Sequence, residues 1–118
     1  MIESDLATYL EPIVSPVTVI VGKTLPSEST SVSIFSVGSL VNNLYPVNLD
    51  SLQISVRSEE LWKTRDLVNL ILTNILGFYG TLGDHQITLW INTVTGDIYE
   101  DDGRTVHKAI LCNIKYLN

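Results

Sequence analysis

Three adjacent carboxylates, Glu100-Asp101-Asp102, have the clearest potential for metal chemistry in this sequence. Carboxylates hold Mg²⁺ in nucleases, where they converge on the ion from several elements. Adjacent side chains diverge instead, and this run leads into Gly103-Arg104, so Asp-Gly is a strong turn signal between two strands. We therefore predict a turn here. A metal-dependent enzyme that uses the three carboxylates is the enzymatic alternative.

The other reactive side chains stand apart from one another. His85 and His107 fall in a predicted turn and on a predicted strand, and neither has a partner at metal-ligand spacing. A catalytic nucleophile needs a base within hydrogen-bond reach. Cys112 is the only cysteine, which excludes an internal disulfide and a cysteine-based zinc site, and we expect it to pack as a small apolar residue. The sequence thus predicts no catalytic residue, metal or cofactor.

Arg57 lies where a predicted strand meets a predicted helix, beside Glu59 and Glu60. An arginine at this position fits either a salt bridge or subunit contact, or a phosphate ligand. We favour the first interpretation, because an arginine in such a place more often forms a salt bridge or an interface contact.

The composition excludes several classes of protein. The length of 118 residues predicts a single domain over 1–118. Seven basic residues against thirteen acidic ones give a net charge of −6, which argues against a basic nucleic-acid reader. Hydrophobic residues make up 45% of the chain and charged ones 17%, where about 25% is usual, so disorder is excluded. In so small a domain, this much apolar surface is expected to meet other subunits.

Neither a signal peptide nor a membrane span is predicted. The first five residues include Glu3 and Asp5, where a signal peptide has positive charges. The longest stretch without charged residues, 29–49, contains five serines, three asparagines and a proline, which are costly in hydrocarbon. We expect a soluble protein made inside the cell.

The apolar periodicity predicts an α+β domain with the element order α-β-β-β-α-β-β. We expect a short N-terminal helix over 3–10 and a long helix over 59–76, with Ser58 as its N-cap. The predicted strands cover residues 17–21, 31–37, 52–57, 87–94 and 105–116. These form a largely antiparallel sheet of four to five strands with the long helix packed on one face.

Two segments carry more apolar surface than a lone domain is expected to hide. The second half of the long helix, 67–76, is apolar on nearly every side, which predicts a second cover from another subunit. Residues 38–51 mix turn residues with apolar ones, and this predicted loop is either a contact arm or folded over its own core. The candidate subunit-interface residues are Trp62, Leu70, Leu72, Ile75, Trp90, Leu44 and Tyr45. A small-ligand or peptide site on a Trp62–Trp90 surface is the binding alternative.

Two motifs and the element order carry a resemblance to a known family. One is a strand that ends in arginine before a long helix, Ile54–Arg57 followed by Ser58-Glu59-Glu60 and Thr64–Leu67. The other is the acidic–Gly–Arg turn Asp101–Arg104 before a final strand that contains Asn113. With these features the chain resembles the tail terminator (tail-completion, or minor capsid) proteins of long-tailed bacteriophages over nearly its whole length. Residues 38–51 match no pattern of that family.

The resemblance implies a structural protein of the virion, made in the host cytoplasm and placed at the head–tail junction. Such proteins form a closed hexameric ring on the tail tube, stop its growth and offer their other face to the connector. The implied partners are further copies of the chain, the major tail tube protein and a connector or neck protein, with no membrane. DNA would pass through the lumen without specific binding, which suits an acidic, lysine-poor chain.

The candidate charged residues of the lumen or ring faces are Arg57, Glu59, Glu60, Glu100, Asp101, Asp102 and Arg104. A tail-tube or neck component of related fold is the alternative within the structural class.

Overall fold

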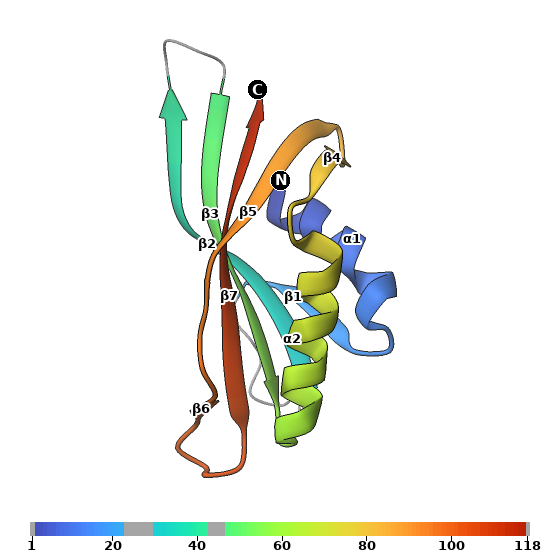
Figure 1. The fold of residues 1–118 in the computed structure, drawn as a ribbon, viewed down its shortest axis with the longest axis vertical. Helices are drawn as coiled ribbons and strands as arrows, with labels where there is room; N and C mark the ends of the chain where they lie inside the picture. Colours follow the sequence, from blue (N-terminus) through green and yellow to red (C-terminus); the bar gives the residue numbers. More distant parts are fainter. Residues whose placement is uncertain (1, 23–29, 43–46, 118) are drawn as a thin grey trace.

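A mixed β-sheet with two helices on one face forms the framework (Figure 1). The computed structural model describes residues 2–22, 30–42 and 47–117. The elements are α1 (Ile2–Val14), β1 (Thr18–Val21), β2 (Thr30–Asn42), β3 (Val47–Ser58), α2 (Leu61–Ile75), β4 (Tyr79–Leu82), β5 (His85–Val94), β6 (Ile98–Tyr99) and β7 (Val106–Leu117).

The sheet is larger than the sequence predicts, and it is partly parallel. Its order is β1-β2-β3-β7-β5-β4, and β6 also pairs with β7, so the described residues form a seven-stranded sheet. The β1–β2 pair is parallel and the other pairs are antiparallel. The predicted number of four to five strands is therefore too small, and the parallel β1–β2 pair was not predicted, although the mixed α and β character is confirmed. The two short strands β4 and β6 were missed.

The core lies between the helices and the sheet, and strand alternation places its residues. In β3, Leu52, Ile54 and Val56 are fully buried, as the pattern predicts, while the intervening side chains point to the other face. Both helices lie on the same side of the sheet (Figure 1). Helix α1 runs to Val14 rather than to Leu10, and Pro12 is exposed within it. The helix continues past this proline because Val14 is buried in the core.

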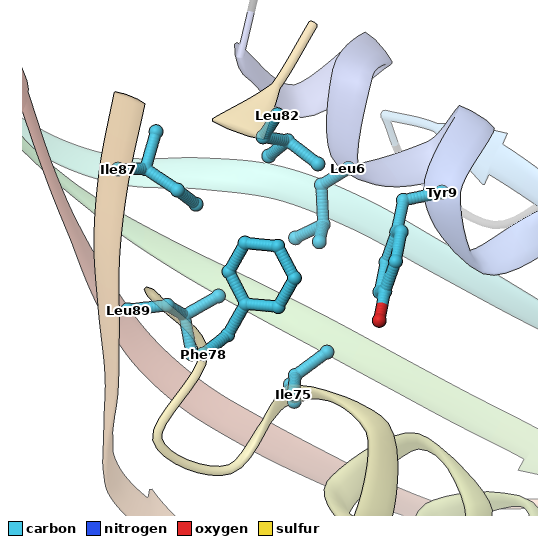
Figure 2. Close-up of a pocket in the computed structure, with 7 residues that line it drawn as sticks. All are labelled: Leu6, Tyr9, Ile75, Phe78, Leu82, Ile87 and Leu89. Atoms are coloured by element: carbon cyan, nitrogen blue, oxygen red, sulfur yellow. The ribbon is translucent and has the colours of Figure 1, made fainter. Parts of the chain in front are cut away.

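A tightly packed apolar contact joins α1, the end of α2 and the β4–β5 hairpin (Figure 2). The Tyr9 ring meets the edge of Phe78 with 5.3 Å between ring centroids, and the Tyr9 hydroxyl donates to the carbonyl of Asn74 at 3.1 Å. The space between these side chains has no room for a water molecule, so it is core packing and not a ligand pocket.

Residues 38–51 are largely sheet, which corrects the predicted loop. Strands β2 and β3 stay paired from Gly38 opposite Ser51 to Asn42 opposite Val47, with residues 43–46 between them. The register shifts between Ser36 and Gly38, so the chain bulges there. The resulting β2–β3 hairpin extends the sheet past the helices (Figure 1). The predicted contact residues Leu44 and Tyr45 lie outside the described residues.

Helix α2 also departs from its prediction at both ends. It begins at Leu61 because Ser58 is the last residue of β3, although the Ser58 hydroxyl does accept the backbone N–H of Glu60 at 3.1 Å. Its second half is covered on one side by this chain's own core. Ile75 is fully buried there, so it has no surface to offer a neighbouring subunit, and Leu72 is half-buried against the same core. Of the three predicted contact residues in this half of the helix, only Leu70 is exposed.

Candidate functional site

The charged residues singled out by the sequence gather at one end of the molecule. The β3–α2 junction and the turn between β6 and β7 lie side by side at the end opposite the β2–β3 hairpin (Figure 1). Arg57 at the end of β3 forms an ion pair with Glu100 from the turn. The salt-bridge interpretation of Arg57 is thus confirmed, with a partner 43 positions away rather than its neighbours in sequence. Of the predicted charged residues at this end, Glu59, Glu60, Asp101, Asp102 and Arg104 are exposed.

The acidic run forms the turn that the Asp-Gly signal predicts. The Asp102 carboxylate accepts the backbone N–H groups of Arg104 and Thr105, both at 2.8 Å, and also the Thr105 hydroxyl. Gly103 has a φ of 72°, which favours glycine, and its N–H donates to the Glu100 carbonyl at 2.9 Å. Asp102 is therefore engaged in holding the turn. In the described part of the chain, no three His, Cys, Asp or Glu side chains are placed to hold a metal ion.

Replacing Asp102 with alanine is expected to destabilise the fold slightly, with a characteristic dependence on pH. The hydrogen bonds from Thr105 and Arg104 lower the pKa of Asp102 to about 2, against roughly 3.9 in an unfolded chain. A carboxyl whose pKa is lowered by folding stabilises the folded state at any pH above its pKa in the unfolded chain. This contribution is lost as the pH falls through its pKa in the folded protein. The difference in Tm between wild type and Asp102→Ala should be largest above pH 5 and should shrink as the pH falls toward 2 and below. A difference that is constant over this range would contradict the assignment.

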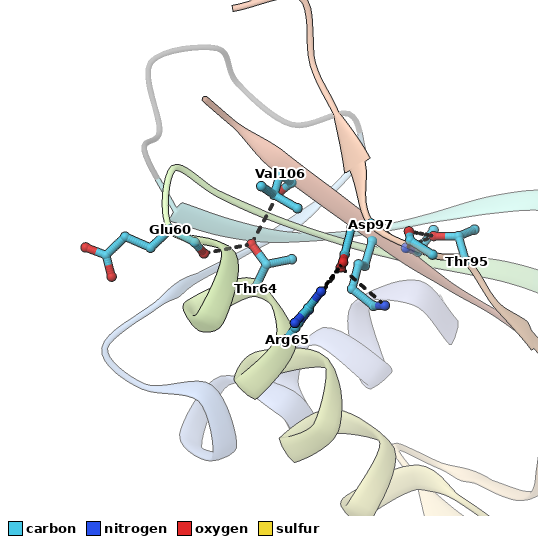
Figure 3. A network of polar contacts seen from close by, with 9 residues as sticks. Glu60, Thr64, Arg65, Thr95, Asp97 and Val106 are labelled. Carbon is cyan, nitrogen blue, oxygen red and sulfur yellow. Dashed lines mark hydrogen bonds and ion pairs between the residues drawn. The ribbon is translucent and has the colours of Figure 1, made fainter. Parts of the chain in front are cut away.

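A second polar network ties α2 to the segment around β6 and β7 (Figure 3). The Arg65 guanidinium forms an ion pair with the Asp97 carboxylate at 2.5 Å, and Lys108 approaches the same carboxylate at 3.5 Å. The hydrogen bond from Arg65 lowers the pKa of Asp97. This network could not be predicted from the sequence, since no local pattern joins residues 32 positions apart. Its role is structural: it fixes the first half of α2 over the sheet.

Thr64 makes buried hydrogen bonds next to this network. Its side chain is fully buried, and its hydroxyl lies 3.2 Å from the Val106 carbonyl and 3.3 Å from that of Glu60 (Figure 3). Thr64→Val keeps the shape and removes the donor, so we expect the free energy of unfolding to fall by about 1 kcal/mol. Urea denaturation measures this change. Thr73→Val is the matched control, because the Thr73 hydroxyl makes a similar bond at 2.8 Å on the exposed surface. Equal losses in the two variants would contradict the buried contact.

The predicted aromatic contacts lie on different faces. Trp62 is 69% exposed on the outer side of α2, where the Arg65 guanidinium lies 5.1 Å from its ring centre. Trp90 is 38% exposed and alternates with the buried Leu89, so it points away from the helices. The alternative of a single ligand surface built from both tryptophans is therefore wrong. A shallow groove of about 370 Å³ runs along α2 instead, lined by Glu60, Trp62, Lys63, Asp66, Leu67 and Leu70.

Cys112 is packed as predicted. It is buried on the helix-facing side of β7, and burial raises the pKa of its thiol to about 12. A thiol with so high a pKa is almost entirely protonated at neutral pH, so it is a poor nucleophile.

A polar pocket that the sequence did not predict lies on the other face of the sheet. We call this face, which no helix covers in the described part of the chain, the helix-free face. The pocket has a volume of about 160 Å³. Its lining residues are Ser33, Phe35, Gln53, Ser55, Arg57, Glu100 and His107. Glu100 comes from the turn after β6, and alternation within the strands marks the other side chains as facing away from the core. Which of them become neighbours depends on the register.

Comparisons with known proteins give a likeness of fold. No protein-family model matches the chain, and no curated protein sequence is significantly similar to it. In the described residues, no helix is both long and apolar enough to cross a membrane. The fold is similar to that of a chain in a solved structure described as the virion of a native gene transfer agent (GTA) particle, with a TM-score of 0.69. The similarity covers 92% of this chain and 84% of that chain at 11% sequence identity, and it shows a shared fold.

Proposed function

We propose that this chain is a structural protein of a phage-like virion, and specifically a tail terminator that forms a ring on the end of the tail tube. The observation that carries the proposal is the fold shared with a chain of the GTA virion over 92% of this sequence. The tail-terminator motifs support the finer assignment, because Arg57 at the strand end and the turn at Asp102 hold the same end of the sheet together.

The shape of the protomer supports a ring with two unlike faces. The principal extents are 48 × 25 × 23 Å, so the molecule is about twice as long as it is wide. The β2–β3 hairpin lies at one end and the charged β6–β7 turn at the other (Figure 1). A terminator needs one face that binds the last ring of the tube and another that does not bind a further copy. Ends of different structure and charge meet this need.

The sides of the protomer, between its two ends, carry residues that are suited to contacts between subunits. Trp62 and Leu70 are exposed along the groove on α2, and tryptophan is enriched among the residues that dominate binding energy at interfaces. At one edge of the sheet, β2 beyond Ile34 has no strand on its outer side in the described residues. Two different lateral surfaces allow a heterologous interface, which closes into a ring when its rotation does.

The charge of the chain fits passage of DNA. Glu59, Glu60 and Asp101 are exposed at the charged end, and the net charge is −6. We propose that these carboxylates border the lumen at the charged face of the ring, where they would repel phosphates and keep DNA from adhering.

The proposal is tested by stoichiometry and by tube length. Native mass spectrometry of the purified chain, alone and with tail tube protein, is expected to show a six-copy ring. Added to polymerising tube protein, the ring should shorten the tubes in electron micrographs as its concentration rises. A monomer that leaves tube length unchanged would contradict the proposal. Open tubes grown from the chain alone would instead identify a tail-tube protein.

A further inference from the structure

Three buried polar atoms without hydrogen-bond partners lie in one row on the helix-free face. In the described part of the chain only four buried side-chain N or O atoms lack a partner, and three of them are Ser31 Oγ, Arg57 Nε and His107 Nε2. Ser31 is opposite Arg57 across the β2–β3 pair, and Arg57 is opposite His107 across the β3–β7 pair. Buried polar groups are almost always paired, so a row of three unpaired ones needs an explanation.

Two of the three atoms belong to residues that line the 160 Å³ pocket on this face. The other polar groups there are already engaged. Glu100 accepts from Arg57 Nη2, and the Gln53 amide donates to the Ser55 hydroxyl at 2.9 Å. The pocket atoms that lack a hydrogen-bond partner are therefore Arg57 Nε and His107 Nε2, and Ser31 is the next residue in the row.

The chemistry of these atoms defines what they would bind. The Arg57 Nε–H is always a donor, and the His107 Nε2 and Ser31 hydroxyl can both donate. A carboxylate has two oxygens that accept from neighbouring donors, and charge-assisted hydrogen bonds of this kind are short and strong. Glu100 already neutralises Arg57, so the negative charge of Glu100 would repel a doubly charged phosphate more strongly than a singly charged carboxylate. The Phe35 ring offers an apolar wall for the carbon attached to the carboxylate.

We propose that this pocket binds a carboxylate group, held by Arg57 Nε and His107 Nε2. The proposal does not depend on the tail-terminator assignment. The carboxylate has two possible sources, a small monocarboxylic acid or an acidic side chain of a neighbouring protein molecule. A small acid of about four heavy atoms is expected to bind only at millimolar concentration, given the limited contacts of so small a ligand.

His107 reports directly on occupancy. Burial lowers the pKa of His107, the positive Arg57 lowers it further, and the negative Glu100 opposes both. A bound carboxylate would add a second negative charge beside the ring, so occupancy should raise this pKa. His85 is the internal control, because it lies far from the pocket. Its ring centre is 4.9 Å from that of Tyr116, a residue of β7 that pairs with the far end of β3.

The test follows the imidazole ¹⁵N signals of the full chain by NMR while sodium acetate is added at constant ionic strength. We expect a saturable shift of His107, a raised His107 pKa and an unchanged His85. Arg57→Gln should weaken acetate binding at least about tenfold, the loss of one charge-assisted contact. Arg104→Gln, which removes an exposed arginine nearby, should leave it unchanged. Sodium phosphate should bind more weakly than acetate.

The same experiment separates the two sources. If a neighbouring molecule supplies the carboxylate, His107 will already be shifted in the assembled protein, and acetate will not move it further. If the ligand is a small acid, acetate will still titrate His107 after assembly. Three results would overturn the proposal: no response of His107 to acetate or assembly, an equal response of His85, or tighter binding of phosphate.

Discussion

Replacing Leu70 with aspartate is expected to abolish ring assembly while leaving the protomer folded. Leu70 is 41% exposed and lies on the α2 groove beside Trp62, so aspartate there meets solvent in the free protomer. In a ring it would bury an unpaired charge in an apolar contact, which costs several kcal/mol. Size-exclusion chromatography with light scattering should show only protomers, with an unchanged circular dichroism spectrum.

The matched control is Asn69→Asp, which adds the same charge at the next position of α2 without removing apolar surface. We expect this variant to assemble. If Leu70→Asp also assembles normally, the groove on α2 is not a subunit contact, and the lateral interface must lie on the sheet edges.

Strong local patterns predicted the central elements. Strand β3 alternates with a period of two, and its buried set Leu52, Ile54 and Val56 is the set that faces the helices. Strand β7 and helix α2 were found for the same reason. In each case one face is buried by a partner within the chain, so hydrophobic periodicity and structure have a common physical cause.

The hairpin beyond the helices shows where local patterns fail. Asn48 and Asp50 resemble turn residues, yet both are buried in β3. The Asp50 carboxylate accepts the Tyr116 hydroxyl at 2.8 Å across the β3–β7 pair, and burial together with this contact raises the Tyr116 pKa to about 12. A partner 66 positions away thus satisfies a polar group that would otherwise disfavour a strand. No local signal contains that information.

The polar pocket could not be predicted for a related reason. Alternation correctly indicates that Arg57 and His107 point away from the core, but it does not say that they are opposite one another. That relation depends on the register between β3 and β7, which the structure supplies. The salt bridge of Arg57 was predicted by residue type, whereas its partner Glu100 again required the register of the whole sheet.

Replacing Ile75 with aspartate is expected to unfold the protomer. Ile75, the last residue of α2, is fully buried against α1 and β5, where it lines the apolar contact with Leu6 and Leu89 (Figure 2). Aspartate would lose this packing and bury a charge with no partner, a combination worth about 4–5 kcal/mol or more. Domains of this size have a total stability of about 5–15 kcal/mol, so little margin is left. Urea denaturation at pH 7 measures the loss.

Leu76→Asp separates burial from charge. Leu76 is the next residue, 71% exposed at the same helix end, so aspartate there meets the same unfavourable helix dipole without entering the core. We expect this variant to lose no more than about 1 kcal/mol. The sequence alone placed Ile75 at a subunit interface. If Ile75→Asp remains folded and fails only to assemble, that earlier placement is correct and the packing of α2 on α1 is not what holds the protomer together.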